Sequence, residues 1–162
     1  MNMATITLII FILLLIAVAV IDAKTMEIPL VLNISIFLLG IVSIWTIGEP
    51  SIISRLIGMI IISLPMLVTV YFIPGGFGGG DIKLMAAVGF FIGWKLNLVA
   101  FFLALLAGGA WGIILLLTKK AGKKDHFAFG PFLCGGIIIA LFVGDELVNW
   151  YLNLGPSLLG MR

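Results

Sequence analysis

Two aspartates stand apart from the other charged residues of the chain. Asp22 ends the first long apolar run, and Asp81 follows five glycines within residues 75–80 and opens another apolar run. Two carboxyl groups that lie within a few ångströms of each other cannot both ionise cheaply, so they share one proton. The charged partner can then take a proton from water while the protonated partner polarises a carbonyl group. This is the chemistry of an aspartic protease, which needs neither a metal nor a nucleophilic serine or cysteine.

The composition around these aspartates excludes a water-soluble fold. Of the 162 residues, 63% are hydrophobic and only 10% are charged, and the mean hydropathy is +1.36. The apolar residues come in runs near twenty long, which is the length that a helix needs to cross about 30 Å of hydrocarbon. The sequence therefore predicts an all-α, polytopic membrane helical bundle that forms a single domain over residues 1–162.

Short breaks rich in glycine, proline and charge divide the chain into six apolar stretches. The first of them lacks the basic flank of a secretory signal peptide, so we interpret it as a permanent span. The expected transmembrane helices cover residues 4–21, 30–47, 53–73, 84–94, 97–118 and 129–144.

The orientation of the bundle follows from the basic residues in its short loops, which favour the cytoplasmic side. Residues 119–126 carry four lysines and are the strongest cytoplasmic signal. By alternation, the breaks at 22–29 and 74–83 are also cytoplasmic, whereas 48–52, 95–96 and both termini lie outside. The basic residues on the cytoplasmic side are then Lys24, Lys83, Lys119, Lys120, Lys123 and Lys124. Those on the outer side are Arg55, Lys95 and Arg162. This topology places both aspartates on the cytoplasmic side.

The apolar run after Asp81 is unusually short. Residues 82–94 rise only about 20 Å as a helix, against about 30 Å of hydrocarbon. If Trp94 lies at the outer interface, Asp81 lies about 10 Å inside the inner one, where a carboxylate is costly unless it is paired or faces a water-filled cavity. Glycine backbone at this depth allows close approach of another chain. We therefore expect residues 75–80 to form a loop that admits a peptide backbone, although a plain flexible hairpin would also fit the glycines alone.

Three sequence blocks resemble the type IV prepilin peptidases. Residues 78–83, Gly-Gly-Gly-Asp-Ile-Lys, match the GxGDxK signature of that family. Asp22 with the trailing Ile28-Pro29 is similar to the first aspartate block of the family. Residues 129–133, Phe-Gly-Pro-Phe-Leu, look like its FGPFL segment, which favours the bacterial branch over the archaeal preflagellin peptidases. The similarity covers most of the chain.

The resemblance implies a multi-pass aspartic endopeptidase of the bacterial cytoplasmic (inner) membrane. Such an enzyme removes the short basic leader of type IV prepilins or pseudopilins at the cytoplasmic face, before assembly into pili or a type II secretion apparatus. By carry-over, Asp22 and Asp81 are the catalytic pair, and no metal or cofactor is expected. The candidate substrate-binding residues are Gly78, Gly79, Gly80, Lys83 and Glu27.

Two of these candidates carry charge, and their expected roles differ. Lys83 matches the lysine of the motif, and it either biases the ionisation of the aspartates or anchors its helix at the interface. Glu27 lies near Asp22 in the sequence and would meet a basic leader electrostatically. The lipid bilayer and the prepilin or pseudopilin substrate are the expected partners; the absence of a long basic run argues against nucleic acid. The oligomeric state stays open.

Many bacterial members of the family carry a cytoplasmic insert with two CxxC pairs between their first two spans, and that insert is associated with N-methylation of the new amino terminus. In this chain the corresponding break covers only residues 22–29. We therefore expect a minimal peptidase in which the methyltransferase part is absent.

The remaining polar residues have simpler interpretations. The lysines of 119–126 set topology, His126 lies at the surface, and Asp145 and Glu146 follow the last apolar run on the outer side. We expect Arg55 to extend its side chain outward to water, as long basic side chains do near helix ends. The single cysteine, Cys134, is expected to act as a small apolar filler.

Three other classes of protein compete with this interpretation. A presenilin-like intramembrane protease shares the GxGD motif but cuts inside a transmembrane segment, and the FGPFL block argues against it. A small ion-coupled transporter would use the aspartates as an ion or proton relay. It would not explain why both aspartates lie at the cytoplasmic edge behind one glycine-rich loop. A purely structural membrane subunit would need neither carboxylate.

Overall fold

A computed structural model describes residues 2–73, 76–118 and 128–158 of the chain. Every regular element in these residues is a helix, and no strand occurs among them. This confirms the predicted all-α class. In chain order the helices are α1 Met3–Thr25, α2 Leu30–Thr46, α3 Ile52–Ile61, α4 Ser63–Phe72, α5 Gly79–Leu117 and α6 Gly130–Leu158.

Four segments of the described chain are long and apolar enough to cross a membrane. They are Met3–Thr25, Ile52–Phe72, Gly79–Leu115 and Gly130–Trp150, and α2 is a shorter apolar helix. Large apolar side chains are exposed on the outside of the bundle, among them Leu13, Val31 and Phe102. Such a surface suits lipid tails and not water. The chain is therefore a multi-pass membrane protein.

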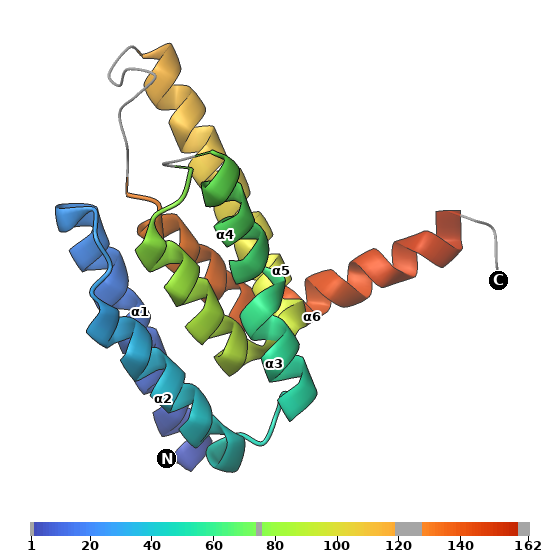
Figure 1. The fold of residues 1–162 in the computed structure, drawn as a ribbon. Helices are drawn as coiled ribbons and strands as arrows, with labels where there is room; N and C mark the ends of the chain where they lie inside the picture. The colour runs from blue at the N-terminus through green and yellow to red at the C-terminus, as the bar shows by residue number, and fades with distance from the viewer. Residues whose placement is uncertain (1, 74–75, 119–127, 159–162) are drawn as a thin grey trace.

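Helix α5 consists of two helices that meet at Gly93. The backbone of Gly93 has φ 79°, a left-handed conformation that only glycine adopts without strain. Figure 1 shows the consequence: the first part of α5 runs down through the bundle, and the second part runs back up beside it. The predicted boundary between the stretches 84–94 and 97–118 falls at this reversal.

The short first part of α5 is enclosed by the rest of the bundle. Nine of the ten residues from 84 to 93 are buried, so this helix has almost no surface for lipid. On one side, Phe11 of α1 stacks on Phe91 with ring centroids 3.9 Å apart. On another, the Asn97 amide donates hydrogen bonds to the carbonyls of Met85 and Gly58. This enclosure explains how a broken helix too short to span the bilayer is tolerated, because its free backbone ends face protein.

The prediction that Arg55 extends outward is wrong. Its side chain is fully buried among α2, α3 and α5. The guanidinium donates hydrogen bonds of 2.7 to 3.4 Å to the Ser43 hydroxyl and to the carbonyls of Gly40, Glu49, Pro50, Phe90 and Phe91. The last turn of a helix leaves carbonyls without intrahelical donors, and the break at Gly93 creates such a turn inside the bundle. Arginine carries five N–H donors and can satisfy several carbonyls at once.

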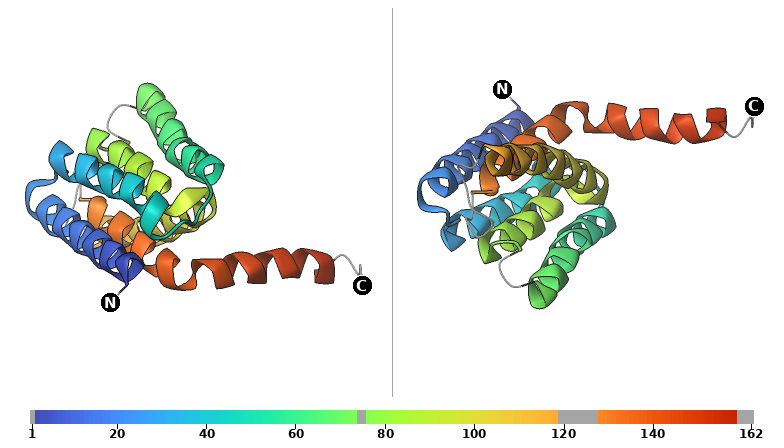
Figure 2. Two further views of the ribbon diagram at one scale, coloured as in Figure 1. Left: turned by 90° about the horizontal axis from the view of Figure 1, so that it is seen from below. Right: turned by 90° about the horizontal axis from the view of Figure 1, so that it is seen from above.

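Helix α6 leaves the bundle at its far end. The part of α6 that begins at Gly130 packs against α1 and α5. The last part of α6 projects sideways from the bundle, as both views of Figure 2 show. The chain's N-terminus lies at this same end of the bundle (Figure 1).

Candidate active site

Asp22 and Asp81 line one cavity of about 260 Å³, which we call the aspartate cavity. Both side chains are buried, with 5% and 8% of their surface exposed, although 59 positions separate them in the chain. The residues that line the cavity come from the end of α1, the connection after it and the start of α5. Figure 1 shows that α1 ends at the end of the bundle away from the N-terminus. The other lining residues of the cavity are Met26, Glu27, Ile28, Gly78, Gly79 and Gly80.

The last turn of α1 and the sharp connection after it place Asp22 in this cavity. Met26 ends the helix in a left-handed conformation with φ 55°, and its N–H donates to the Asp22 carbonyl at 2.8 Å. Such a residue is a common helix terminator. Pro29 then precedes the first residue of α2, so only four residues join the two helices. The short connection brings Glu27 and Ile28 to the cavity wall.

Asp81 is held by the start of its own helix. It is the third residue of α5, and its Oδ2 accepts a hydrogen bond of 3.2 Å from the Gly78 N–H. A carboxylate at this position satisfies one of the N–H groups that a helix start leaves free. Its other oxygen, Oδ1, is buried and has no hydrogen-bond partner in the described part of the chain. One carboxyl oxygen of Asp81 is thus held by a hydrogen bond, and the other can still form one.

The cap at Asp81 also corrects the expected limits of the glycine loop. Because α5 begins at Gly79, Gly79 and Gly80 belong to its first turn and not to the loop. Asn33 of α2, which is almost fully buried, supports this turn by donating from its amide to the Gly80 carbonyl at 3.3 Å. Sequence reasoning missed Asn33, although a lone amide inside an apolar helix is a signal of a specific polar contact.

Asp22 receives a hydrogen bond from a residue 108 positions away. The Gly130 N–H, at the start of α6, donates to Asp22 Oδ2 at 2.8 Å. Gly130 lies in the FGPFL block, which the sequence identified without a role for any of its residues. Each aspartate thus has one oxygen fixed by a backbone N–H at a helix start, and the two carboxyl groups are near enough to interact electrostatically.

A match to a family model shows to which protein family this chain belongs. The model of the type IV leader peptidase family matches residues 9–113, which is more than half of the chain and includes both aspartates. The chain belongs to the type IV leader peptidase family. The resemblance drawn from the three sequence blocks is thereby confirmed.

Curated proteins named prepilin leader peptidase/N-methyltransferase are similar to this leader peptidase family member. The chain is 36% identical over 148 residues to the protein of that name from Bacillus subtilis strain 168, covering 90% of this chain and 59% of the relative. It is 37% identical over 76 residues to the one from Legionella pneumophila, covering 47% of this chain and 26% of the relative. The chain thus spans about three-fifths of the first relative and about a quarter of the second. No solved structure matches the chain significantly.

The two charged candidates for substrate binding in this leader peptidase family member, Glu27 and Lys83, differ in their position relative to the aspartate cavity. Glu27 lines the aspartate cavity and is exposed to solvent there, as a residue that meets a charged ligand must be. Lys83 is exposed on α5 and is not part of the cavity wall. Both of its expected roles stay predictions. The lysines of 119–124 and His126 lie outside the described residues.

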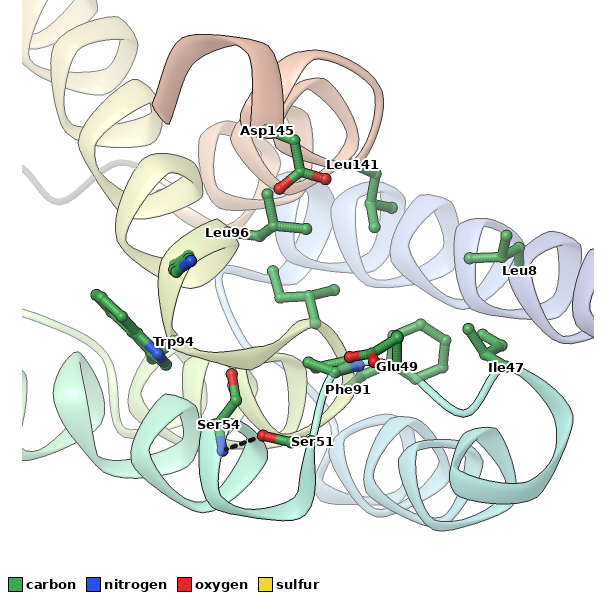
Figure 3. Close-up of a pocket in the computed structure, with 13 residues that line it drawn as sticks. Leu8, Ile47, Glu49, Ser51, Ser54, Phe91, Trp94, Leu96, Leu141 and Asp145 are labelled. Carbon is green, nitrogen blue, oxygen red and sulfur yellow. Dashed lines mark hydrogen bonds between the residues drawn. The ribbon is translucent and has the colours of Figure 1, made fainter. Parts of the chain in front are cut away.

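A second cavity, of about 570 Å³, lies elsewhere in the bundle. Figure 3 shows Asp145 of α6 and Glu49 of the α2–α3 connection on its wall, together with Leu8 of α1 and Trp94. None of its lining residues belongs to the aspartate cavity. Asp145 is therefore separate from the aspartate pair, as expected. Cys134 is buried in the hydrophobic core, which agrees with its predicted role as an apolar filler.

Proposed function

We propose that this chain is an aspartic endopeptidase of the bacterial inner membrane that removes the basic leader of type IV prepilins or pseudopilins at the cytoplasmic face. The observation that carries the proposal is the meeting of Asp22 and Asp81, both buried in an apolar bundle, on the wall of one cavity. Buried carboxyl groups without basic partners are costly in a membrane protein and mark functional sites. The names of the relatives supply the substrate class.

The proposed reaction uses the aspartate pair and one water molecule. The charged carboxylate takes a proton from the water as the water oxygen bonds to the scissile carbonyl carbon. The protonated carboxyl gives its proton to the carbonyl oxygen, which becomes a hydroxyl group. When this tetrahedral intermediate collapses, the C–N bond breaks and the leaving nitrogen takes a proton from the carboxyl that received one from water. One hydroxyl group of the intermediate returns its proton to the other aspartate as it becomes the new carbonyl, which restores the pair to its starting state.

The cavity wall offers groups that can hold a substrate beside this pair. Gly79 and Gly80 occupy the first two positions of α5, where N–H groups have no acceptor within their own helix. We assign them, with Gly78, to the backbone of an extended substrate. Glu27 is assigned to the positive charge of the leader. A basic leader would then lie along the α1–α2 connection while its scissile bond reaches the aspartates.

This function predicts metal-free cleavage by the chain in lipid vesicles. The purified protein should shorten a prepilin by its leader, and neither a chelator nor reagents for serine and cysteine should slow the reaction. Mass spectrometry of the products gives the cut position. A cut within the apolar segment of the substrate would favour the presenilin-like alternative. Inhibition by a chelator that added zinc reverses would contradict the mechanism, and the absence of any cleavage would contradict the function.

We further propose six membrane segments, with the aspartate cavity facing the cytoplasm and both termini outside. The lysine distribution supports this orientation. It predicts that Ala121→Cys and Asn149→Cys, each in a Cys134→Ser background, are labelled from opposite faces of the membrane by an impermeant thiol reagent. Labelling of position 121 from outside intact cells would overturn cytoplasmic cleavage, whereas labelling of position 149 alone would support it.

The absence of methyltransferase activity stays a prediction. The α1–α2 connection, where the cysteine-bearing insert is expected, has four residues and no cysteine. The relatives from Bacillus subtilis and Legionella pneumophila carry both activities in their name. We propose that the chain cleaves without methylating the new amino terminus.

A further inference from the structure

The hydrogen bond between Gly130 and Asp22 is the best-formed contact of the aspartate pair. The donor nitrogen and the acceptor Oδ2 are 2.8 Å apart, and the bond is buried. By comparison, the bond from Gly78 to Asp81 is 3.2 Å long and only partly buried. A short N–H bond to a carboxylate is stronger than one between neutral groups and stabilises the charge.

The start of α6 leaves this particular N–H free. The next residue, Pro131, has no N–H, and the N–H groups of Phe132 and Leu133 both donate to the Phe129 carbonyl. The N–H of Gly130 is therefore the donor in the first turn of α6 that can bond to a group outside this helix. The positive end of the helix dipole lies at the same place and favours a negative charge there.

Only glycine allows the backbone to come this close to Asp22. A Cβ atom at position 130 would lie 2.6 Å from Asp22 Oδ2 and 2.8 Å from its Cγ. Side-chain atoms do not approach a Cβ so closely, so the carboxyl group would have to shift. Any other residue would push the carboxyl away from the N–H that holds it.

We propose that Gly130 is a positioning residue that keeps the Asp22 carboxylate charged and oriented, so that Asp22 is the member of the pair that takes the proton from water. Asp81 then carries the shared proton, because its Oδ1 has no donor in the described structure and can bear a proton without losing a hydrogen bond. This inference rests on the proposed function. It assigns the proton-accepting role to Asp22 and the proton-donating role to Asp81. It also assigns a function to Gly130 of the FGPFL block.

The titratable groups near Asp22 come from three elements. Asp81 belongs to α5, Glu27 to the α1–α2 connection, and Cys134 to α6. The three atoms nearest to a Cβ added at position 130 all belong to Asp22 and to none of these other residues. A shift in the pH dependence that follows from such a change therefore reports on the Asp22 contact.

The test compares Gly130→Ala with Gly135→Ala in the vesicle assay. Gly135 lies on the same helix, and a Cβ there meets no atom within 4 Å. We expect Gly130→Ala to cleave prepilin about 10- to 100-fold more slowly, the range that corresponds to losing a hydrogen bond to a charged group. Gly135→Ala should cleave at the unchanged rate. The low-pH limb of the rate profile should move to higher pH in Gly130→Ala, whereas a smaller folded fraction would lower the profile without moving it.

A second variant removes the donor without adding an atom that clashes. Incorporation of glycolic acid at position 130 replaces the N–H by an ester oxygen, and it should slow cleavage and move the low-pH limb in the same direction, even if Gly130→Ala does not accumulate. An unmoved profile in the ester variant would overturn the role of Gly130. If that occurs while Asp22→Asn is inactive, only the positioning role fails; if Asp22→Asn cleaves normally, the proposed function fails with it.

Discussion

Replacement of Asp22 or Asp81 by asparagine is expected to abolish leader removal while the chain still inserts and folds. Asparagine keeps the size of the side chain, but it can neither take a proton from water nor share one with its partner. General acid–base catalysis contributes about 100- to 10,000-fold to a rate, so each variant should lose at least about 100-fold. The measurement is the rate of prepilin shortening in vesicles that contain equal amounts of folded protein.

The matched controls for this prediction are Asp145→Asn and Glu146→Gln. Both residues are exposed acidic side chains on α6 and lie outside the aspartate cavity. They remove the same kind of charge without touching the proposed chemistry, so their rates should equal that of the unchanged chain. If either asparagine variant of the pair retains more than a few per cent of the normal rate, that aspartate is not catalytic.

Replacement of Arg55 by methionine is expected to cause the largest loss of stability. The change leaves a similar volume but removes the donors to five carbonyls and the Ser43 hydroxyl in the bundle interior. Each buried acceptor left without a donor costs about 1–3 kcal/mol. Several such losses together approach the whole stability of a small domain, which is about 5–15 kcal/mol. We expect the variant to accumulate poorly or to unfold at a much lower temperature in detergent.

Two further variants separate the hydrogen bonds of Arg55 from its charge. Arg55→Lys keeps the charge but has three donors in place of five, so its unfolding temperature should fall between those of the unchanged chain and Arg55→Met. Lys95→Met removes an exposed charge near the same turn and should leave stability almost unchanged. An Arg55→Met protein that unfolds within a few degrees of the unchanged chain would show that the carbonyls find other donors.

The sequence by itself determined the class of the fold, most helix positions and the candidate pair. Hydrophobic length is a local property, and transfer to lipid depends on the residues of each segment alone, so the predicted stretches overlap the helices. Their limits differ where the helix continues into less apolar residues: α5 begins at Gly79 instead of 84, and α6 runs to Leu158 instead of 144. The sequence blocks around Asp22 and Asp81 were enough to indicate the family. The lysines of the loops were enough to predict that both aspartates belong to one side.

Only the tertiary structure decided how the pair and the helix that carries Asp81 are held. The burial of Arg55 could not be predicted, because hydropathy treats a basic residue near a helix end in the same way whether water or unpaired carbonyls surround it. The contact from Gly130 to Asp22 uses a backbone N–H, a group that every residue except proline possesses, so no residue type marks the one that donates. Which backbone group meets which side chain across 108 positions depends on how α1 and α6 pack, and that is a property of the assembled bundle.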